Sequence, residues 1–199
     1  MMPLHHVLVA TDLSPASLHG LDRALEIARA TAARCTVMTA LGLEPGAPLQ
    51  ELLGVDASGT LGRFVEQQRA VLTTLVARQS GDMAPAPEIR VETGLAADVI
   101  PAFAESDGVD LIVIGFRGRG ALRRLVLGST ASHLLRKSRH PVLIVKSAAE
   151  APYRRVLVPV DFSPASESAL RMARIVARGA DLLLLHVVDV PFEGLLSYA

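Results

Sequence analysis

The sequence predicts an α/β fold: an open, doubly wound sheet of five parallel strands, followed by a partial β-α-β repeat. Three observations support this fold class. Short apolar runs rich in β-branched residues alternate with longer segments of helical periodicity. The run at 110–115 is apolar almost throughout, as expected of a central parallel strand that helices cover on both faces. A segment near the start of the chain recurs near its end.

The elements of the first part follow in chain order. Residues 7–10 form a compact apolar strand, after which Ser14 and Pro15 supply an N-cap and a first-turn proline for an amphipathic helix over 15–32. A strand is expected at 35–41, and glycines and prolines predict a long loop over 42–59. The remaining expected elements are a helix over 61–79, a strand at 88–93, a helix over 96–106, a strand at 110–115, a helix over 129–139 and a strand at 141–146.

An internal repeat sets the expected domain organisation. Residues 7–17, VLVATDLSPAS, recur as VLVPVDFSPAS at 156–166, and the apolar face of the helix that follows recurs at the same offset. We therefore expect one complete domain over 1–147. The beginning of a second is expected over 148–199, with strands at 154–160 and 181–188.

Composition excludes several function classes. The chain has 199 residues, with 20 Lys and Arg against 20 Asp and Glu, and this balance argues against a general binder of nucleic acid or anionic membranes. No run approaches the roughly 18 apolar residues of a membrane span, and the first residues do not resemble a signal peptide. A cytoplasmic protein is expected. The single cysteine, Cys35, lies in an apolar run and is expected to be an inert buried thiol.

A loop rich in glycine and arginine follows the strand at 110–115. Glycines allow a close approach of backbone to ligand, and the helix expected to start at Ser129 offers N–H groups to an anion. Seven basic and no acidic residues lie between Gly115 and His140, so the rest of the chain carries a net charge of −7. This pattern suits a phosphorylated small molecule, although glycine after a strand and serine at a helix start are also ordinary turn chemistry.

The spacing Gly115-x2-Gly118-x9-Gly128-Ser129 resembles the nucleotide motif of the ATP-binding branch of the universal stress protein family. An Asp after the first strand and a Pro-Val-Leu-Ile-Val last strand fit the same family. The resemblance covers 5–147 as a complete domain and 154–190 as part of a second. It implies an adenine nucleotide alpha hydrolase-like sheet, ATP as the ligand and a homodimer or higher oligomer.

The resemblance also implies which residues bind the nucleotide. They are Ala10, Thr11, Asp12, Ala40, Ile114, Gly115, Arg117, Gly118, Gly128, Ser129 and Thr130. Asp12 would approach the ribose or adenine, Ala40 would present adenine-facing backbone, and the glycine loop would hold the phosphates. Ala10 departs from the proline common in the family, which the second copy retains as Pro159. The second copy has no counterpart of the glycine loop, so no second complete site is expected.

The chemistry of the site favours binding over fast turnover. Ser129 and Thr130 have no evident acid or histidine to activate them, so no catalytic residue is assigned. The histidines lack zinc-site spacing, so no resident metal is assigned either. Asp12 could coordinate Mg²⁺ that arrives with ATP, although such an acid is more often a turn or cap residue. Three functions stay open: an ATP-binding stress or regulatory protein, a slow ATPase or phosphoryl-transfer enzyme, and a nucleotide-free assembly module joined through 154–190 and a sheet edge.

Overall fold

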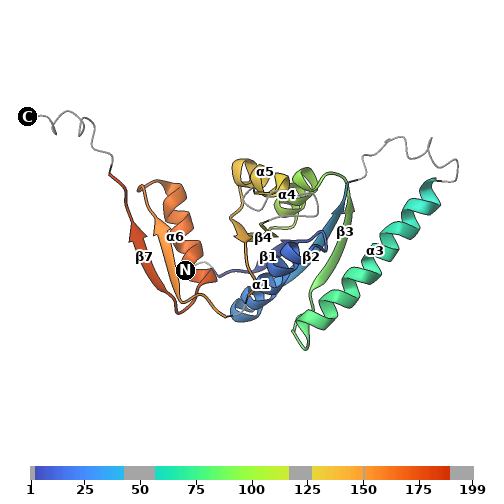
Figure 1. Cartoon of the computed structure of the whole chain (residues 1–199), viewed down its shortest axis with the longest axis horizontal. Coiled ribbons are helices and arrows are strands. Elements are labelled where there is room, and N and C mark those ends of the chain that lie inside the picture. Colours follow the sequence, from blue (N-terminus) through green and yellow to red (C-terminus); the bar gives the residue numbers. More distant parts are fainter. Residues whose placement is uncertain (1–2, 43–56, 117–126, 150, 189–199) are drawn as a thin grey trace, which may run out of the picture. The chain divides into compact units, whose positions relative to one another are not determined.

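The computed structural model describes residues 3–42, 57–116, 127–149 and 151–188 (Figure 1). The chain divides into two compact units, Met1–Glu150 and Ala151–Ala199, and each is described by itself. None of the helices in the described ranges combines the length and the apolar character needed to cross a membrane.

The first unit contains a five-stranded parallel sheet. Its strands lie in the order β3-β2-β1-β4-β5, and every neighbouring pair runs parallel. The strands are β1 His6–Ala10, β2 Arg34–Leu41, β3 Glu88–Thr93, β4 Leu111–Gly115 and β5 Val142–Val145. The predicted fold class, an open doubly wound α/β sheet, is confirmed.

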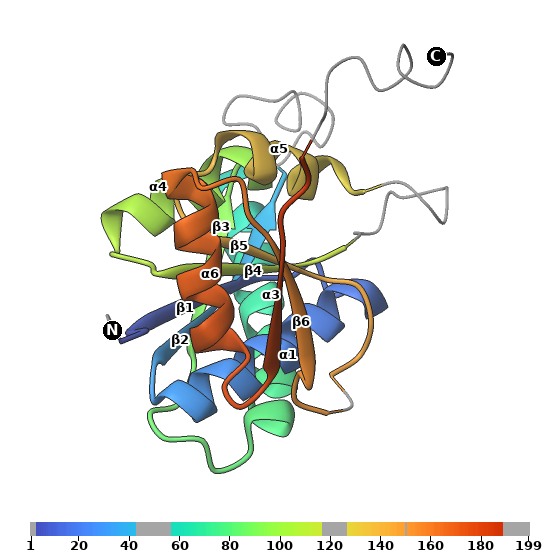
Figure 2. The same cartoon turned by 90° about the vertical axis from the view of Figure 1, so that its left-hand side faces the viewer.

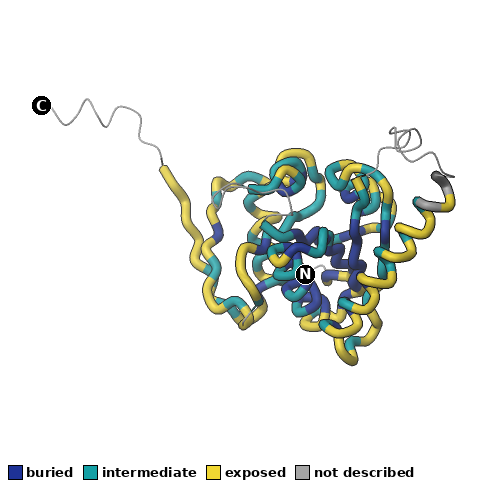
Figure 3. Tube along the Cα trace, turned by 45° about the vertical axis from the view of Figure 1, so that its right-hand side comes forward, coloured by how far each residue is buried: buried dark blue, intermediate teal, exposed yellow. Residues whose placement is uncertain are grey.

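Within the described residues, four helices cover the two faces of this sheet. They are α1 Pro15–Thr31, α3 Ala57–Ser80, α4 Ala96–Ser106 and α5 Ser129–Lys137. Figures 1 and 2 show α4 and α5 on one face and α1 and α3 on the other. The residues of β1 and β4 are buried except for the partly buried last residue of each strand (Figure 3). Because helices cover both faces, the sequence of β4 is apolar without alternation.

Two element boundaries in this unit differ from the sequence prediction by two residues or more. Helix α3 begins at Ala57, so residues 57–59, predicted as loop, are helical. Gly59, which suggested a loop, costs a helix only about 1 kcal/mol relative to alanine, and the rest of this 24-residue helix outweighs that cost. Helix α5 ends at Lys137 rather than at 139. Ser138 takes up extended backbone (φ −70°, ψ 136°), and its hydroxyl accepts from His140 N–H at 3.0 Å, a local turn that replaces the helix.

The second unit is a β-α-β segment. Strand β6 (Arg155–Pro159) pairs in parallel with β7 (Asp181–Leu185), and α6 (Pro164–Val176) connects them. The strand predicted over 181–188 therefore ends three residues early. Val160 N–H donates to the Leu185 carbonyl at 2.8 Å, which closes the ladder where β6 ends. Within the described residues, 186–188 therefore have no strand opposite them.

The local geometry of the repeat is the same in both units. Ser14 and Ser163 are the N-caps of α1 and α6, and each accepts a hydrogen bond from the backbone N–H three residues later. Leu13 and Phe162, which precede these caps, have the same left-handed φ of 62°. The repeated sequence thus folds into a repeated strand, turn and cap.

Candidate functional site

The topology of the first unit brings the predicted site residues that the structure describes to one edge of the sheet. Strand order reverses between β1 and β4, and open α/β sheets bind ligands beyond the carboxyl ends of the strands at such a point. Ala10 is in register with Ile114 on one side and with Met38 on the other. Ala40 lies two residues beyond Met38 on β2, so it reaches past the end of β1 at the same edge.

Internal hydrogen bonds hold the loop after β1 in a single conformation. Thr11 N–H donates to the Met38 carbonyl at 2.9 Å, and the Thr11 hydroxyl lies 2.8 Å from the Ser17 hydroxyl. The same Thr11 oxygen accepts from Leu13 N–H at 3.0 Å, and Asp12 Oδ1 accepts from Ser14 N–H at 3.0 Å. Thr11 is buried and Asp12 is partly exposed. Thr11 therefore shapes the loop, and Asp12 is its partly exposed polar side chain.

Gly115 allows α1 to lie directly against the end of β4. A Cβ at this position would lie 2.5 Å from the Ala16 carbonyl oxygen and 2.7 Å from Ser17 Cα. Gly20, one helical turn further along α1, also faces this junction, because its Cβ would lie 3.0 Å from the Gly115 nitrogen. The packing requires glycine at 115, independently of any ligand. It also fixes the start of α1, with its Asp12 loop, relative to β4.

The N-terminus of α5 lies beside the end of β4. Gly128 is the N-cap residue (φ −60°, ψ 153°) and has no side chain to cap the helix. Its own N–H donates to the Phe116 carbonyl at 3.1 Å, which ties the helix start to the end of β4. The first N–H groups of a helix have no acceptor within the helix, and together with the helix dipole they favour an anion. Ser129 is exposed and Thr130 is half-buried in this first turn.

Two contributors were missed by the sequence analysis. The Ser17 hydroxyl supports Thr11 through the hydroxyl pair, and the recurrence of Ser17 as Ser166 in the internal repeat was the available signal. Lys146, which directly follows β5, places its ammonium 5.9 Å from the centre of the Phe116 ring and adds a positive charge at this edge. The predicted residues Arg117 and Gly118 lie outside the described residues.

Comparisons with known proteins identify the family. Residues 3–146 and 152–199 match the sequence model of the universal stress protein family. The chain belongs to this family. A universal stress protein of Mycolicibacterium smegmatis is 38% identical over 132 residues, which are 63% of this chain and 43% of the relative. The chain thus spans less than half of the length of this curated relative.

Solved universal stress proteins share the fold. One from Archaeoglobus fulgidus superposes with a TM-score of 0.71 at 22% identity, covering 96% of this chain and 70% of the other. A universal stress protein in complex with cAMP superposes with a TM-score of 0.52 at 28% identity, covering 74% of this chain and all of the other. The first comparison supports the architecture, and the second comes from a protein with a nucleotide bound.

Other features of this universal stress protein lie away from the strand ends. A cavity of about 300 Å³ is lined by Asp22, Leu25, Glu26, Arg29, Gln79 and Ala149, none of which is a predicted site residue. Within the described ranges, no group of three or more His, Cys, Asp or Glu side chains is arranged to hold a metal ion. Burial raises the pKa of the Cys35 thiol to about 12, so this residue is not a nucleophile.

Proposed function

We propose that this chain binds an adenine nucleotide, ATP, at the carboxyl edge of its first sheet and serves as a cytoplasmic, nucleotide-dependent stress or regulatory protein. The observation that carries this proposal is the start of α5. Gly128 leaves the helix without a side-chain cap. The hydrogen bond from Gly128 N–H to the Phe116 carbonyl holds the positive end of the helix dipole at the end of β4, at the same sheet edge as the Asp12 loop. A related protein 28% identical to this one holds cAMP, which supports a nucleotide as the ligand class.

Each part of the site would have a separate role. The first-turn N–H groups and hydroxyls of Ser129 and Thr130 would hold phosphate oxygens, and by the sequence motif Arg117 and Gly118 would join them. Asp12, in its fixed loop, would accept from a ribose hydroxyl, and the backbone at Ala40 would face the base. Mg²⁺ would enter with the phosphates, since one carboxylate at Asp12 is too few ligands for a resident ion.

Calorimetric titration of ATP with Mg²⁺ present tests this proposal. Binding is expected for the natural chain, and Gly128→Glu should weaken it at least about tenfold, because a carboxylate would occupy the phosphate position at the helix start. Gly62→Glu is the matched control, because Gly62 is exposed on α3 with nothing within 4 Å of its added Cβ. No heat with the natural chain, or equal affinity in Gly128→Glu, would overturn the proposal.

We further propose that residues 148–199 form part of a second family repeat without a complete nucleotide site, and that the chain forms a homodimer or higher oligomer through a sheet edge and this segment. In the second unit, Leu157, Leu183 and Leu184 of the two-stranded sheet are exposed. Apolar strands with open edges favour pairing with another chain. Light scattering at micromolar concentration should give at least twice the mass of one chain. A monomer would contradict this part of the proposal.

A further inference from the structure

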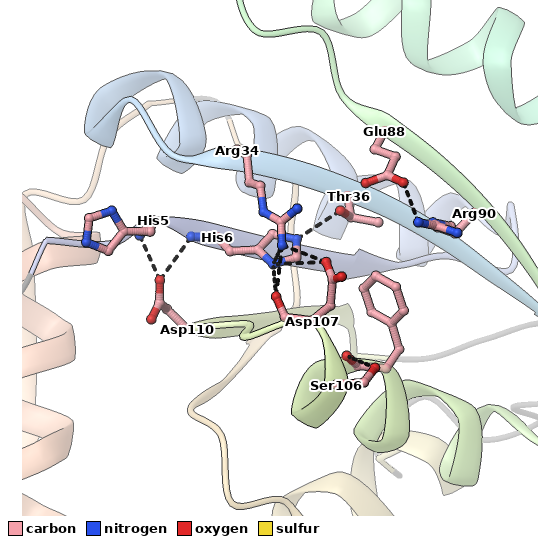
Figure 4. Close-up of polar contacts among 10 residues, drawn as sticks. His5, His6, Arg34, Thr36, Glu88, Arg90, Ser106, Asp107 and Asp110 are labelled. Atoms are coloured by element: carbon pink, nitrogen blue, oxygen red, sulfur yellow. Dashed lines mark hydrogen bonds and ion pairs between the residues drawn. The ribbon is translucent and has the colours of Figure 1, made fainter.

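A buried polar cluster lies at the opposite edge of the first sheet, where β1 and β2 begin. His6 is at its centre and is 1% exposed. Figure 4 shows its ring between Thr36 and Arg34 of β2 on one side and Asp107, in the turn before β4, on the other. The nucleotide site proposed above uses none of these residues, since it lies at the carboxyl ends of the strands.

The contacts of the His6 ring bear on which nitrogen carries its proton. Nε2 lies 2.9 Å from the Thr36 hydroxyl, and Nδ1 lies 3.0 Å from Nη2 of Arg34. A guanidinium can only donate hydrogen bonds, so the Arg34 contact is a hydrogen bond only when Nδ1 is unprotonated. We assign this tautomer, with the proton on Nε2 and directed to Thr36, because the Arg34 contact is the shorter of those that Nδ1 makes.

Nδ1 also lies close to a second set of acceptors. It is 3.2 Å from the backbone carbonyl oxygen of Asp107 and 3.7 Å from the carboxylate oxygen Oδ2 of the same residue. Arg34 Nη2 donates to these same two oxygens, at 2.8 Å and 2.6 Å. Arg34 and Nδ1 of His6 thus both lie near the same two oxygens of Asp107, and Arg34 is the one that donates to them in the neutral state.

The other charged groups around the ring are already engaged. Asp110 Oδ2 accepts from the backbone N–H groups of His5 and His6, at 2.7 Å and 2.9 Å. On the α4 side the ring meets the edge of Phe103, at 6.3 Å between centres. Arg90 of β3 lies over that Phe103 ring and is paired with Glu88 at 2.7 Å. Arg34 and Asp107 are therefore the charged groups beside Nδ1 whose contacts change when this atom gains a proton.

We propose that His6, Arg34 and Asp107 form an acid-operated switch. A proton that arrives on Nδ1 turns this atom from an acceptor into a donor, so Arg34 can no longer donate to it. His6 then donates to Asp107, and the guanidinium of Arg34 turns into solvent. The Arg34 side chain is already 49% exposed, so it can leave without opening the core. In acid, the ion pair that links β2 to the turn before β4, Arg34 with Asp107, is replaced by an ion pair that links β1 to that turn, His6 with Asp107.

The ionisation of His6 sets the direction of the switch. Burial, and then the nearby charge of Arg34, lower the pKa of His6 below its ordinary 6.5, while Asp107 and Asp110 act in the opposite sense. The unfolded chain therefore takes up this proton at a higher pH than the folded chain does. The stability that neutral His6 contributes is complete above pH 6.5 and is lost as the pH falls through the pKa of the folded state.

Nitrogen-detected NMR of the full chain, titrated from about pH 7.5 to 4.5, tests the proposal. At the start, Nδ1 of His6 should have the shift of an unprotonated ring nitrogen. As it becomes protonated below pH 6.5, the exchange protection of the Arg34 guanidinium should fall with the same midpoint. A protonated Nδ1 at pH 7.5, or Arg34 protection that stays constant while His6 titrates, would overturn the switch.

Variants separate the switch from general acid sensitivity. Arg34→Met should raise the midpoint of His6, because it removes the nearby positive charge, and Asp107→Asn should lower it. His5→Asn is the matched control, since His5 contributes its backbone N–H rather than its ring to the cluster, and it should leave the midpoint unchanged. An unchanged midpoint in Arg34→Met would refute the coupling. If a variant fails to fold, the titration of the natural chain still decides.

Discussion

Gly115→Ala is the substitution that most directly probes the junction between α1 and β4. The added Cβ would lie 2.5 Å from the Ala16 carbonyl oxygen, 2.8 Å from the Ala16 carbonyl carbon and 2.7 Å from Ser17 Cα. All three neighbours are backbone atoms, so no side chain can rotate away to relieve the contact. The first turn of α1 itself must move.

The size of that movement sets the expected loss of stability. Ordinary contact begins at 3.4 Å, so the helix start must retreat by about 0.9 Å from the strand. This retreat would disturb the Thr11–Ser17 hydroxyl pair and the packing of Gly20 on β4. Overpacking of this kind lowers the free energy of unfolding by about 1–3 kcal/mol. Because the contacts of the new Cβ are all with backbone atoms, which cannot rotate away, we expect Gly115→Ala to lie in the upper part of this range, at about 2–3 kcal/mol.

Urea unfolding followed by circular dichroism measures the effect. With a slope of about 1–3 kcal/mol per molar urea, the midpoint should fall by about 1 M. Gly62→Ala is the matched control, since Gly62 is exposed within α3 and nothing lies within 4 Å of its added Cβ. It should be neutral or stabilise by up to about 1 kcal/mol. A Gly115→Ala chain as stable as Gly62→Ala would refute the packing argument.

Three further predictions concern other buried or capping groups. Ser14→Ala removes the acceptor for Ser17 N–H at the N-cap of α1 and should lower the free energy of unfolding by about 1 kcal/mol in urea; an unchanged value would argue against the cap. Thr36→Val leaves the Nε2 proton of buried His6 without its acceptor and should lower the free energy of unfolding by about 1–3 kcal/mol, measured by thermal unfolding. The control Thr74→Val, on the exposed face of α3, should change it by less than about 0.5 kcal/mol. Equal effects of the two substitutions would contradict the His6 hydrogen bond. Because burial raises the pKa of Cys35 to about 12, iodoacetamide at pH 8 should label it only as the chain unfolds, and labelling as fast as that of free cysteine would show that the thiol is accessible.

The fold could be predicted from the sequence because local and long-range signals agree. The continuous apolar run of β4 requires helices on both faces, and the Ser14-Pro15 pair marks the start of α1, so strand and helix follow from residue type alone. The repeated segment in the second unit has the same cap and the same left-handed residue before it. The length of a strand also depends on the strand that pairs with it, which the sequence pattern does not show. The pattern therefore predicted a strand to residue 188, whereas β7 ends at Leu185.

The site could be predicted only in part. The spacing of the glycine motif located Gly128 and Ser129 at the start of α5, and the order of elements along the chain placed Asp12 directly after β1. Spacing could not reveal that Thr11 commits its hydroxyl to Ser17, or that Gly115 is required by the approach of α1, because both depend on contacts between elements. The His6 cluster was missed for the same reason, since Arg34, Asp107 and Asp110 meet His6 only in the folded sheet.

The most direct test of the central claim is to add ATP with Mg²⁺ to the isotope-labelled chain and map the backbone amide shifts. The account predicts that the largest changes occur at Ser129 and Thr130, with further changes at Asp12 and Ala40, and that adenosine without phosphates leaves the amides of the α5 start nearly unchanged. Shifts confined to other surfaces, or no shifts at millimolar ATP, would contradict a nucleotide site at the carboxyl edge of this sheet.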